Sequence, residues 1–182
     1  MHVSSKTRSS VGAPRGRASS ASAEVRQPGV VDHAVDRSEV RWAPVWLAAR
    51  LLGALSLLAV GAVHLQQYEY LYSAIPTIGT LFVLNFVGAT AMGLGLLAPV
   101  ERLLGRFGGA AVSLLALGGV GLAATAFVFL LVAERTPVFG FMEPGYDPPA
   151  IMASRVAELV TVALLGSFLV ARLVRKMPVG RW

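Results

Sequence analysis

The sequence predicts an all-α membrane protein: an antiparallel four-helix transmembrane bundle with a disordered N-terminal tail. The first observation is a set of four apolar runs, each at least as long as the roughly 20 residues that a helix needs to cross the apolar core of a bilayer. The second is the composition, with 55% hydrophobic and only 14% charged residues, whereas soluble domains have about 25% charged residues. The third is the way in which the basic residues alternate between the connections.

Three segments follow from this pattern. Residues 1–41 are expected to form a disordered, basic and serine-rich cytoplasmic tail, because they show no hydrophobic period and bury too little apolar surface to offset the entropy cost of ordering. Residues 42–176 form the transmembrane domain, and residues 177–182 form a cytoplasmic C-terminal end. The predicted helices cover residues 45–66, 75–98, 109–133 and 151–174.

The basic residues predict the orientation of the chain. Seven of the 16 basic residues precede the first helix, Arg102 and Arg106 lie between the second and third, and four lie near or after the end of the fourth. The other two connections contain only Arg135 as a basic residue. Because cytoplasmic loops are enriched in Lys and Arg, both termini are expected in the cytoplasm.

The same charges bear on location and partners. The strong preference for Arg over Lys is typical of a GC-rich bacterial genome, so we expect a multi-pass protein of the bacterial inner (plasma) membrane. A net charge of +6 in a soluble protein would suggest nucleic acid. In cytoplasmic flanks of membrane helices it indicates attraction to anionic lipid headgroups, and no nucleic-acid partner is expected.

The ends of the helices carry interface signals. Trp42 and Trp46 mark the inner end of the first helix, since indole rings favour the headgroup level. Arg50 is expected to snorkel back to that surface. Three tyrosines follow this helix in a connection without basic residues, which is typical of an outer aromatic belt. Pro76 lies in the first turn of the second helix, where its missing N–H costs little.

The remaining connections and the small residues complete the bundle. The short segment ERLLGRFGG predicts a tight cytoplasmic hairpin between the second and third helices. The longer outer segment before the fourth helix is expected to be a solvated acidic loop with Glu143 and Asp147. Small residues at four-residue spacing let helix backbones approach closely: Ala89/Gly93, Ala91/Gly95 and Gly119/Ala123. They fit packing inside one bundle, and they also fit a seam between copies in a homo-oligomer.

Glu158 is the most informative single residue. It lies about two turns inside the fourth helix, and a carboxylate at that depth marks a functional site by default. Arg155 lies on the same helix face and is the expected partner. The alternatives are a structural ion pair and a carboxyl group that is simply protonated.

Other polar residues reach a similar depth from the outer surface. The four helices therefore predict a pocket that opens outward, with six candidate ligand-binding residues: His64, Gln67, Asn85, Thr125, Arg155 and Glu158. The alternative is a set of ordinary interhelical hydrogen bonds.

The residue inventory limits the chemistry. The chain has no cysteine, which excludes thiolate chemistry, iron–sulfur clusters and Cys-ligated zinc. His64 is the single histidine of the membrane domain, so it cannot form a bis-His haem site within one chain. We expect no metal and no cofactor. Motifs for phosphate loops, zinc peptidases and serine hydrolases are absent from the sequence, and the shortage of titratable groups makes catalysis the less favoured reading.

The first two predicted helices contain RLLGALSLLAVGAVHL, which starts with Arg50, then a short aromatic connection, and then the Ile-Pro entry to IPTIGTLFVLNFVGATAMGLGLL. In these features they resemble small four-helix bacterial membrane proteins of the DoxX-like type. The resemblance implies a quinone-linked or redox-stress role, without a catalytic residue that can be assigned here.

Three functional classes remain from the sequence. The favoured one is a non-enzymatic bundle that binds or moves a small apolar or lipid-like molecule. The others are a quinone-linked redox accessory protein and a structural subunit of a larger membrane complex.

Overall fold

The computed structural model describes residues 37–176, with side chains for residues 44–175. Four of its helices are long and apolar enough to cross a membrane, which confirms the predicted all-α four-helix bundle. The first, α1 (Arg37–Gln67), continues into one π-helical turn, η1 (Tyr68–Tyr72). Next come α2 (Pro76–Leu97), two short turns, α3 (Val100–Leu103) and η2 (Gly105–Phe107), and finally α4 (Gly108–Ala133) and α5 (Pro148–Lys176).

The start of α1 corrects the predicted extent of the tail. We expected a disordered tail to residue 41, but the backbone is already helical from Arg37. The stretch from Arg37 to Trp42 contains neither glycine nor proline, the two residues that most disfavour a helix. The rest of the predicted tail, residues 1–36, and the C-terminal end, residues 177–182, lie outside the described residues.

The start of α5 also comes earlier than predicted, at Pro148 rather than residue 151. The Asp147 carboxylate accepts a hydrogen bond from the backbone N–H of Ala150, at 3.1 Å, and thus acts as an N-cap. Pro148 and Pro149 occupy the first turn, where the missing N–H groups have no helical partner to lose. Asp147, which was expected to be a solvated loop residue, therefore caps the N-terminus of α5.

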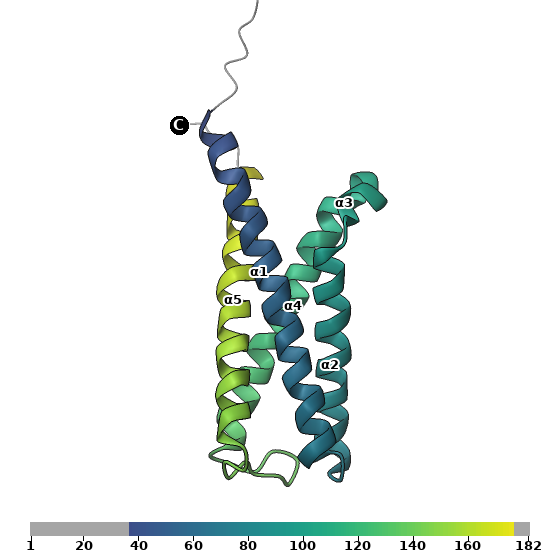
Figure 1. The fold of residues 1–182 in the computed structure, drawn as a ribbon, viewed down its shortest axis with the longest axis vertical. Helices are drawn as coiled ribbons and strands as arrows, with labels where there is room; N and C mark the ends of the chain where they lie inside the picture. Colours follow the sequence, from purple (N-terminus) through teal and green to yellow (C-terminus); the bar gives the residue numbers. More distant parts are fainter. Residues whose placement is uncertain (1–36, 177–182) are drawn as a thin grey trace, which may run out of the picture. The chain divides into compact units, whose positions relative to one another are not determined.

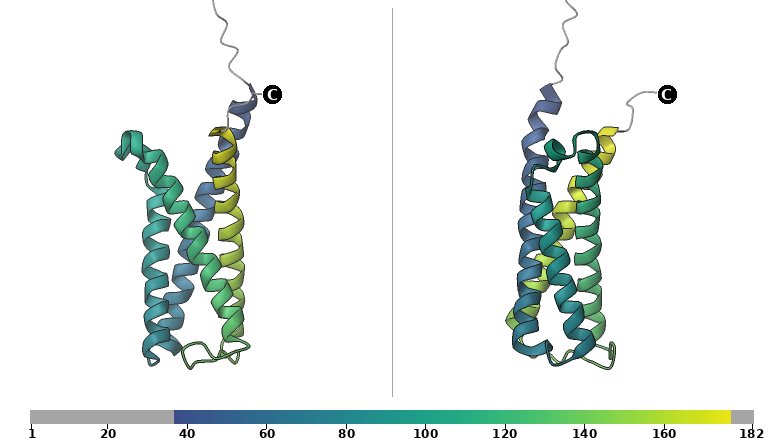
Figure 2. Two further views of the ribbon diagram at one scale, coloured as in Figure 1. Left: turned by 180° about the vertical axis from the view of Figure 1, so that it is seen from behind. Right: turned by 90° about the vertical axis from the view of Figure 1, so that its right-hand side faces the viewer.

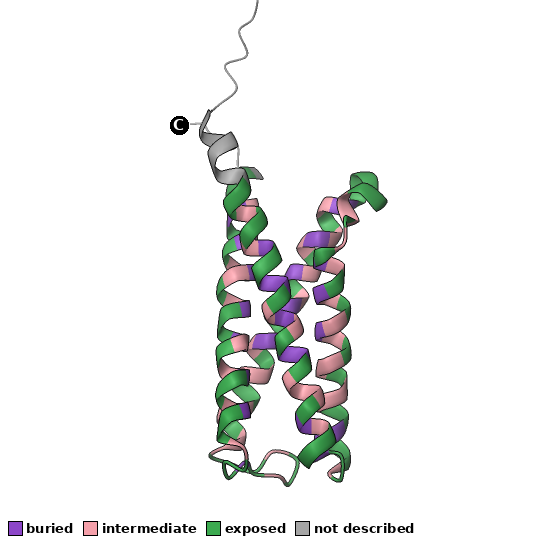
Figure 3. Cartoon of the chain, in the orientation of Figure 1, coloured by how far each residue is buried: buried purple, intermediate pink, exposed green. Residues whose placement is uncertain are grey.

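The four long helices run up and down and pack as a ring (Figures 1 and 2). Helix α1 packs against α2 and α5, and α4 packs against the same two helices. Many of the buried residues, purple in Figure 3, lie where the helices cross. The fully buried side chains include Leu57, Leu96 and Leu165. An interhelical hydrogen bond from the Ser56 hydroxyl to the carbonyl oxygen of Ala157, at 2.9 Å, joins α1 to α5.

The two ends of this bundle differ in charge. At the upper end in Figure 1 lie the start of α1, the α3–η2 connection and the end of α5, with Arg102, Arg106, Arg172 and Arg175. We call it the basic end. At the opposite end lie η1 and the loop of residues 134–147, where Glu69, Glu134, Glu143 and Asp147 outnumber the single basic residue, Arg135. We call it the acidic end.

Two of the three small-residue pairs pack inside the bundle, whereas Ala91 of the Ala91/Gly95 pair is exposed. A Cβ atom on Gly93 would lie 2.7 Å from the Leu58 side chain of α1, and one on Gly119 would lie 2.8 Å from Leu57. Ala89 and Ala123 are fully buried. These glycines allow close helix approach within one chain, so the Ala89/Gly93 and Gly119/Ala123 pairs need no second copy to explain them.

Arg50 is buried rather than extended to the surface. Its Nε donates to the Leu96 carbonyl at 2.8 Å and its Nη2 to the Ala98 carbonyl at 3.0 Å. Its Nη1 lies 2.6 Å from the Glu101 carboxylate. The last carbonyls of a helix have no partner within that helix. The guanidinium of α1 therefore caps the C-terminus of α2, a role that the predicted snorkelling did not include.

Candidate functional site

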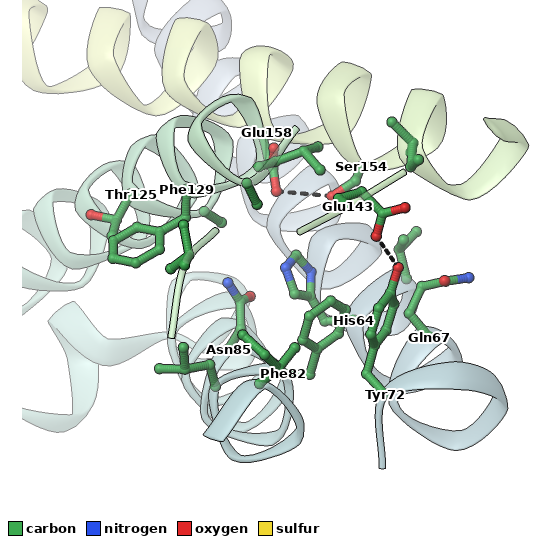
Figure 4. A pocket seen from close by; sticks show the side chains of 18 of the residues that line it. His64, Gln67, Tyr72, Phe82, Asn85, Thr125, Phe129, Glu143, Ser154 and Glu158 are labelled. Atoms are coloured by element: carbon green, nitrogen blue, oxygen red, sulfur yellow. Dashed lines mark hydrogen bonds between the residues drawn. The ribbon is translucent and has the colours of Figure 1, made fainter. Parts of the chain in front are cut away.

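A cavity of about 440 Å³ lies inside the half of the bundle that is nearer the acidic end (Figure 4). All four long helices, η1 and the loop of residues 134–147 contribute to its wall. Most lining side chains are aliphatic or aromatic, such as Val63, Ile78 and Leu130, and polar groups are few. The volume and the apolar lining are those of small-molecule binding sites in proteins.

The structure brings five of the six predicted site residues to the wall of this cavity: His64, Gln67, Asn85, Thr125 and Glu158. Arg155, the sixth, is not part of the lining. Tyr72, Glu143 and Ser154 supply further polar groups. Their clustering does not test whether a ligand binds there, so ligand binding at these residues stays a prediction.

His64 extends from the last turn of α1 toward the other polar groups of the cavity (Figure 4). Its Nδ1 lies 2.9 Å from the carbonyl oxygen of Val60, and because a carbonyl only accepts, Nδ1 carries the proton. In the neutral ring this leaves Nε2 as an acceptor. The ring centroid lies 5.1 Å from that of Phe82, so packing and the Val60 bond together fix the orientation of the imidazole.

Glu158 is the most deeply buried ionisable side chain of the site, with 1% of its surface exposed. Its Oε1 accepts a hydrogen bond from the Ser154 hydroxyl at 2.9 Å, one helical turn earlier on α5. Its Oε2 has no hydrogen-bond partner among the described residues. A buried polar atom without a partner is costly, so this oxygen is the main unexplained feature of the cavity.

The expected ion pair between Arg155 and Glu158 is wrong. Arg155 pairs instead with Glu134, the residue that follows the last turn of α4. Both side chains of that pair are 29% exposed, so the pair is partly accessible, whereas Glu158 is almost fully buried. A long arginine side chain gains more from the partly hydrated end of a helix than from a deep carboxylate.

The acidic end of the cavity is closed by contacts that the sequence did not reveal. Tyr72 donates a hydrogen bond from its hydroxyl to Glu143, and the Glu143 carboxylate also accepts from the backbone N–H groups of Gly145, at 2.9 Å, and Tyr146, at 3.1 Å. Glu143 is 6% exposed, so the expectation that it is a solvated loop residue is wrong. Its carboxylate instead organises the loop over the cavity.

Gln67 is also engaged at this end. Its Nε2 donates to the Asp147 carboxylate at 2.9 Å, and the other oxygen of that carboxylate caps α5. This links the end of α1 to the start of α5. Gln67 is thus a predicted site residue whose amide group mainly supports the structure.

Asn85 and Thr125 differ in what they offer. The Asn85 Oδ1 atom is buried without a hydrogen-bond partner among the described residues, and the side chain faces the same space as His64 (Figure 4). The Thr125 hydroxyl oxygen points away from the other labelled polar groups in that view. Asn85 is therefore a candidate ligand contact, whereas Thr125 contributes mainly to the wall.

Sequence reasoning missed two lining residues that matter, Tyr72 and Phe82. Tyr72 belongs to the π-helical turn η1 and is buried, at 4% exposure, whereas its neighbour Tyr70 is 77% exposed. The sequence pattern predicted that Tyr70 and Tyr72 belong to one outer aromatic belt. A π-turn cannot be read from this sequence, and Phe82 has no polar signal that would have singled it out.

The part of the chain that the structure describes contains no group of three or more His, Cys, Asp and Glu side chains placed to hold a metal ion. Hydrogen bonding of an organic molecule needs no such group, and His64, Asn85 and Glu158 all line the cavity with polar side chains.

Comparison with models of protein families, with curated proteins and with solved structures finds no match for this chain. The DoxX-like resemblance of the first two helices therefore stays a prediction. By its four apolar helices, the chain is a multi-pass integral membrane protein.

Proposed function

We propose that this integral membrane protein binds, or moves across part of the bilayer, a small and mainly apolar molecule in the cavity among its four helices. The observation that carries the proposal is an apolar wall that holds two of the four buried side-chain atoms without a hydrogen-bond partner among the described residues, Asn85 Oδ1 and Glu158 Oε2. A packed structural core keeps such atoms hydrogen-bonded. A binding site keeps them for its ligand.

Two glycines provide a matched test. Gly121 lines the cavity, and a Cβ atom at Gly121 would have no neighbour within 4 Å. Gly166 has the same free space but does not line the cavity. Both lie within long helices, so Gly→Leu raises helix propensity similarly at the two positions. The pair separates loss of cavity volume from the other effects of the substitution.

The experiment is native mass spectrometry of protein released from nanodiscs that were formed from cell membranes. The parent and Gly166→Leu are expected to carry a small molecule that Gly121→Leu lacks, because leucine at position 121 adds bulk to the cavity wall. Thermal unfolding checks that both variants are folded. If neither the parent nor a variant carries a small molecule, and the same protein partner is present in each preparation, the binding function is wrong. The chain is then better described as a structural subunit of a larger membrane complex.

We also propose the orientation and location of the bundle. With the basic end in the cytoplasm, the arginines of α3, η2 and the end of α5 lie near anionic headgroups and the acidic end faces outward. The asymmetry of charge between the two ends supports this orientation. A bacterial plasma membrane is the location that fits the arginine-rich composition.

A further inference from the structure

The exposed part of the cavity wall lies on only two helices. Among the lining residues of the described chain, those with exposed side chains or backbone are Leu81, Leu84, Gly121, Thr125 and Phe129. The first two belong to α2 and the other three to α4. Lining residues from α1, α5, η1 and the loop are buried or half-buried. The cavity is therefore exposed along one side of the bundle, between α2 and α4.

The arrangement of the helices explains this side opening. Toward the basic end α2 and α4 are in close contact, because a Cβ atom on Gly88 would lie 2.8 Å from Leu122 and one on Gly118 would lie 2.6 Å from the sulfur of Met92. Toward the acidic end α4 diverges from α2 and approaches α5, as the left view of Figure 2 shows. We call the gap lined by Leu81, Leu84, Thr125 and Phe129 the lateral window.

The other routes into the cavity are obstructed. At the acidic end, the bonds of Tyr72 to Glu143 and of Gln67 to Asp147 hold the loop and helix ends together. At the basic side, the fully buried Leu57 and Leu165 fill the centre of the bundle. A molecule that reaches the cavity by the lateral window comes from the apolar core of the bilayer, since α2 and α4 are membrane-spanning helices.

The polar groups inside the cavity have a common character. His64 presents Nε2 as an acceptor because its Nδ1 donates to Val60, and Asn85 Oδ1 and Glu158 Oε2 have no donor among the described residues. With Glu158 ionised, its carboxylate oxygen, the Asn85 amide oxygen and the His64 Nε2 atom are all acceptors, and a ligand that donates hydrogen bonds complements them best. A hydroxyl or an amino group has this chemistry, whereas an ether or an alkane lacks it.

We infer that the cavity takes its ligand from the bilayer through the lateral window, and that this ligand is an amphiphile with an apolar body and a hydrogen-bond-donating head that meets His64, Asn85 and Glu158. The inference rests on the proposed function and makes it specific in two respects, the route of entry and the chemistry of the head. A separate experiment tests the chemistry of the head and the route of entry.

The first experiment tests the head with four ten-carbon probes: 1-decanol, decylamine, decyl methyl ether and decane. Each is titrated into phosphatidylcholine nanodiscs that hold the protein. Bound probe is counted by native mass spectrometry against its mole fraction in the lipid. We expect 1-decanol and decylamine to bind at least tenfold more tightly than the other two, the factor that corresponds to about 1.4 kcal/mol. Asn85→Leu is expected to reduce that preference while decane still binds.

The results separate a failure of the donor-head inference from a failure of the proposed binding function. If all four probes bind the parent equally and Gly121→Leu abolishes binding, the donor-head inference is wrong and the proposed apolar binding function holds. If no probe binds the parent, or if Gly121→Leu and the parent bind alike, the proposed function itself fails. Gly166→Leu is the control in every titration.

The second experiment tests the route, and the absence of cysteine from the chain makes it direct. Leu84→Cys and Thr125→Cys place two thiols across the lateral window, and a flexible bismaleimide joins them. The control pair, Met92→Cys and Gly118→Cys, joins the same helices where they are packed. The protein is first loaded with deuterated 1-decanol, and its replacement by unlabelled 1-decanol from the lipid is followed. We expect the window cross-link to slow this replacement at least tenfold and the control cross-link to have no such effect. Equal exchange in both would overturn lateral entry.

Discussion

At the residue scale, the distinctive feature of the cavity is polar atoms that are only partly hydrogen-bonded. Ser154 donates a hydrogen bond to one oxygen of Glu158, and the second oxygen has no partner within the described part of the chain. The only nearby cation on the same helix, Arg155, is committed to Glu134. Removing Glu158 therefore strands no buried positive charge, which is the usual reason why loss of one ionic partner is destabilising.

Glu158→Gln and Glu158→Leu are expected to unfold at the same temperature as the parent or a higher one, with a gain of up to about 2 kcal/mol. Functional residues often cost stability in this way. Thermal unfolding in a mild detergent measures it, with the exposed Val160→Leu as the control on the same helix. A loss above about 2 kcal/mol in both variants, the size of an unmade buried hydrogen bond, would mean that Glu158 has a stabilising partner in the membrane.

Arg155→Leu is expected to cost less than about 1 kcal/mol, because its ion pair with Glu134 is partly exposed. The same unfolding assay applies, and Glu134→Gln is the reciprocal variant. If the pair contributes little, the two single variants and the double variant differ from the parent by similar small amounts. A loss of about 3–5 kcal/mol, the value for a buried pair, would contradict this exposed geometry.

At the element scale, the ends of the helices are held by side chains from distant parts of the chain. Arg50 of α1 caps the last carbonyls of α2, and Asp147 caps α5 while it holds Gln67 of α1. In the loop, Phe139 and Gly140 have positive φ values of 51° and 79°, between paired Val138 and Phe141. This geometry is that of a tight two-residue hairpin turn.

Arg50→Leu is expected to destabilise the protein by about 2–3 kcal/mol, because it leaves helix-terminal carbonyls without a donor. Arg50→Lys is expected to recover only part of this loss, since an ammonium cannot reproduce the planar fork of the guanidinium. Chemical unfolding followed by circular dichroism is the measurement. Arg106→Leu, at an exposed position, is the control and should unfold like the parent.

Tyr72→Phe is expected to loosen the loop over the cavity while the four helices stay intact. It removes the hydroxyl that bonds Glu143, and one hydrogen bond to a carboxylate corresponds to roughly tenfold faster opening. Hydrogen–deuterium exchange of residues 134–147 reports it, with α4 as the internal reference. Tyr70→Phe is the matched control, because Tyr70 is 77% exposed. Equal exchange in both variants would show that this bond does not hold the loop.

At the scale of the whole molecule, the number of helices and their antiparallel order could be predicted because length and hydrophobicity alone determine them. Five of the six residues chosen by depth line one cavity, since depth in a straight helix is a matter of counting. The partners of Arg155 and Glu143 could not be predicted, because they depend on the path of the loop and on the π-turn at Tyr72. The window between α2 and α4 likewise depends on a helix crossing that no periodicity encodes.

The orientation of the whole bundle has a direct test in the cysteine-free chain. Tyr70→Cys at the acidic end and Leu103→Cys at the basic end both replace strongly exposed side chains, 77% and 73%. In intact bacterial cells, a membrane-impermeant maleimide is expected to label position 70, and to label position 103 only after permeabilisation. The reverse pattern would invert the proposed topology.

The cap that Arg50 places on α2 also bears on how the protein is made. The chain emerges N-terminus first, so α1 enters the membrane before its guanidinium acceptors exist, since Leu96 lies 46 residues later in the sequence. Until then the charge of Arg50 has to be solvated at the edge of the bilayer, because hydrocarbon offers it no acceptor. Completion of the second span supplies the Leu96 and Ala98 carbonyls and Glu101 together. The first two spans are therefore expected to associate as a hairpin during biosynthesis, before α4 and α5 arrive to enclose the cavity.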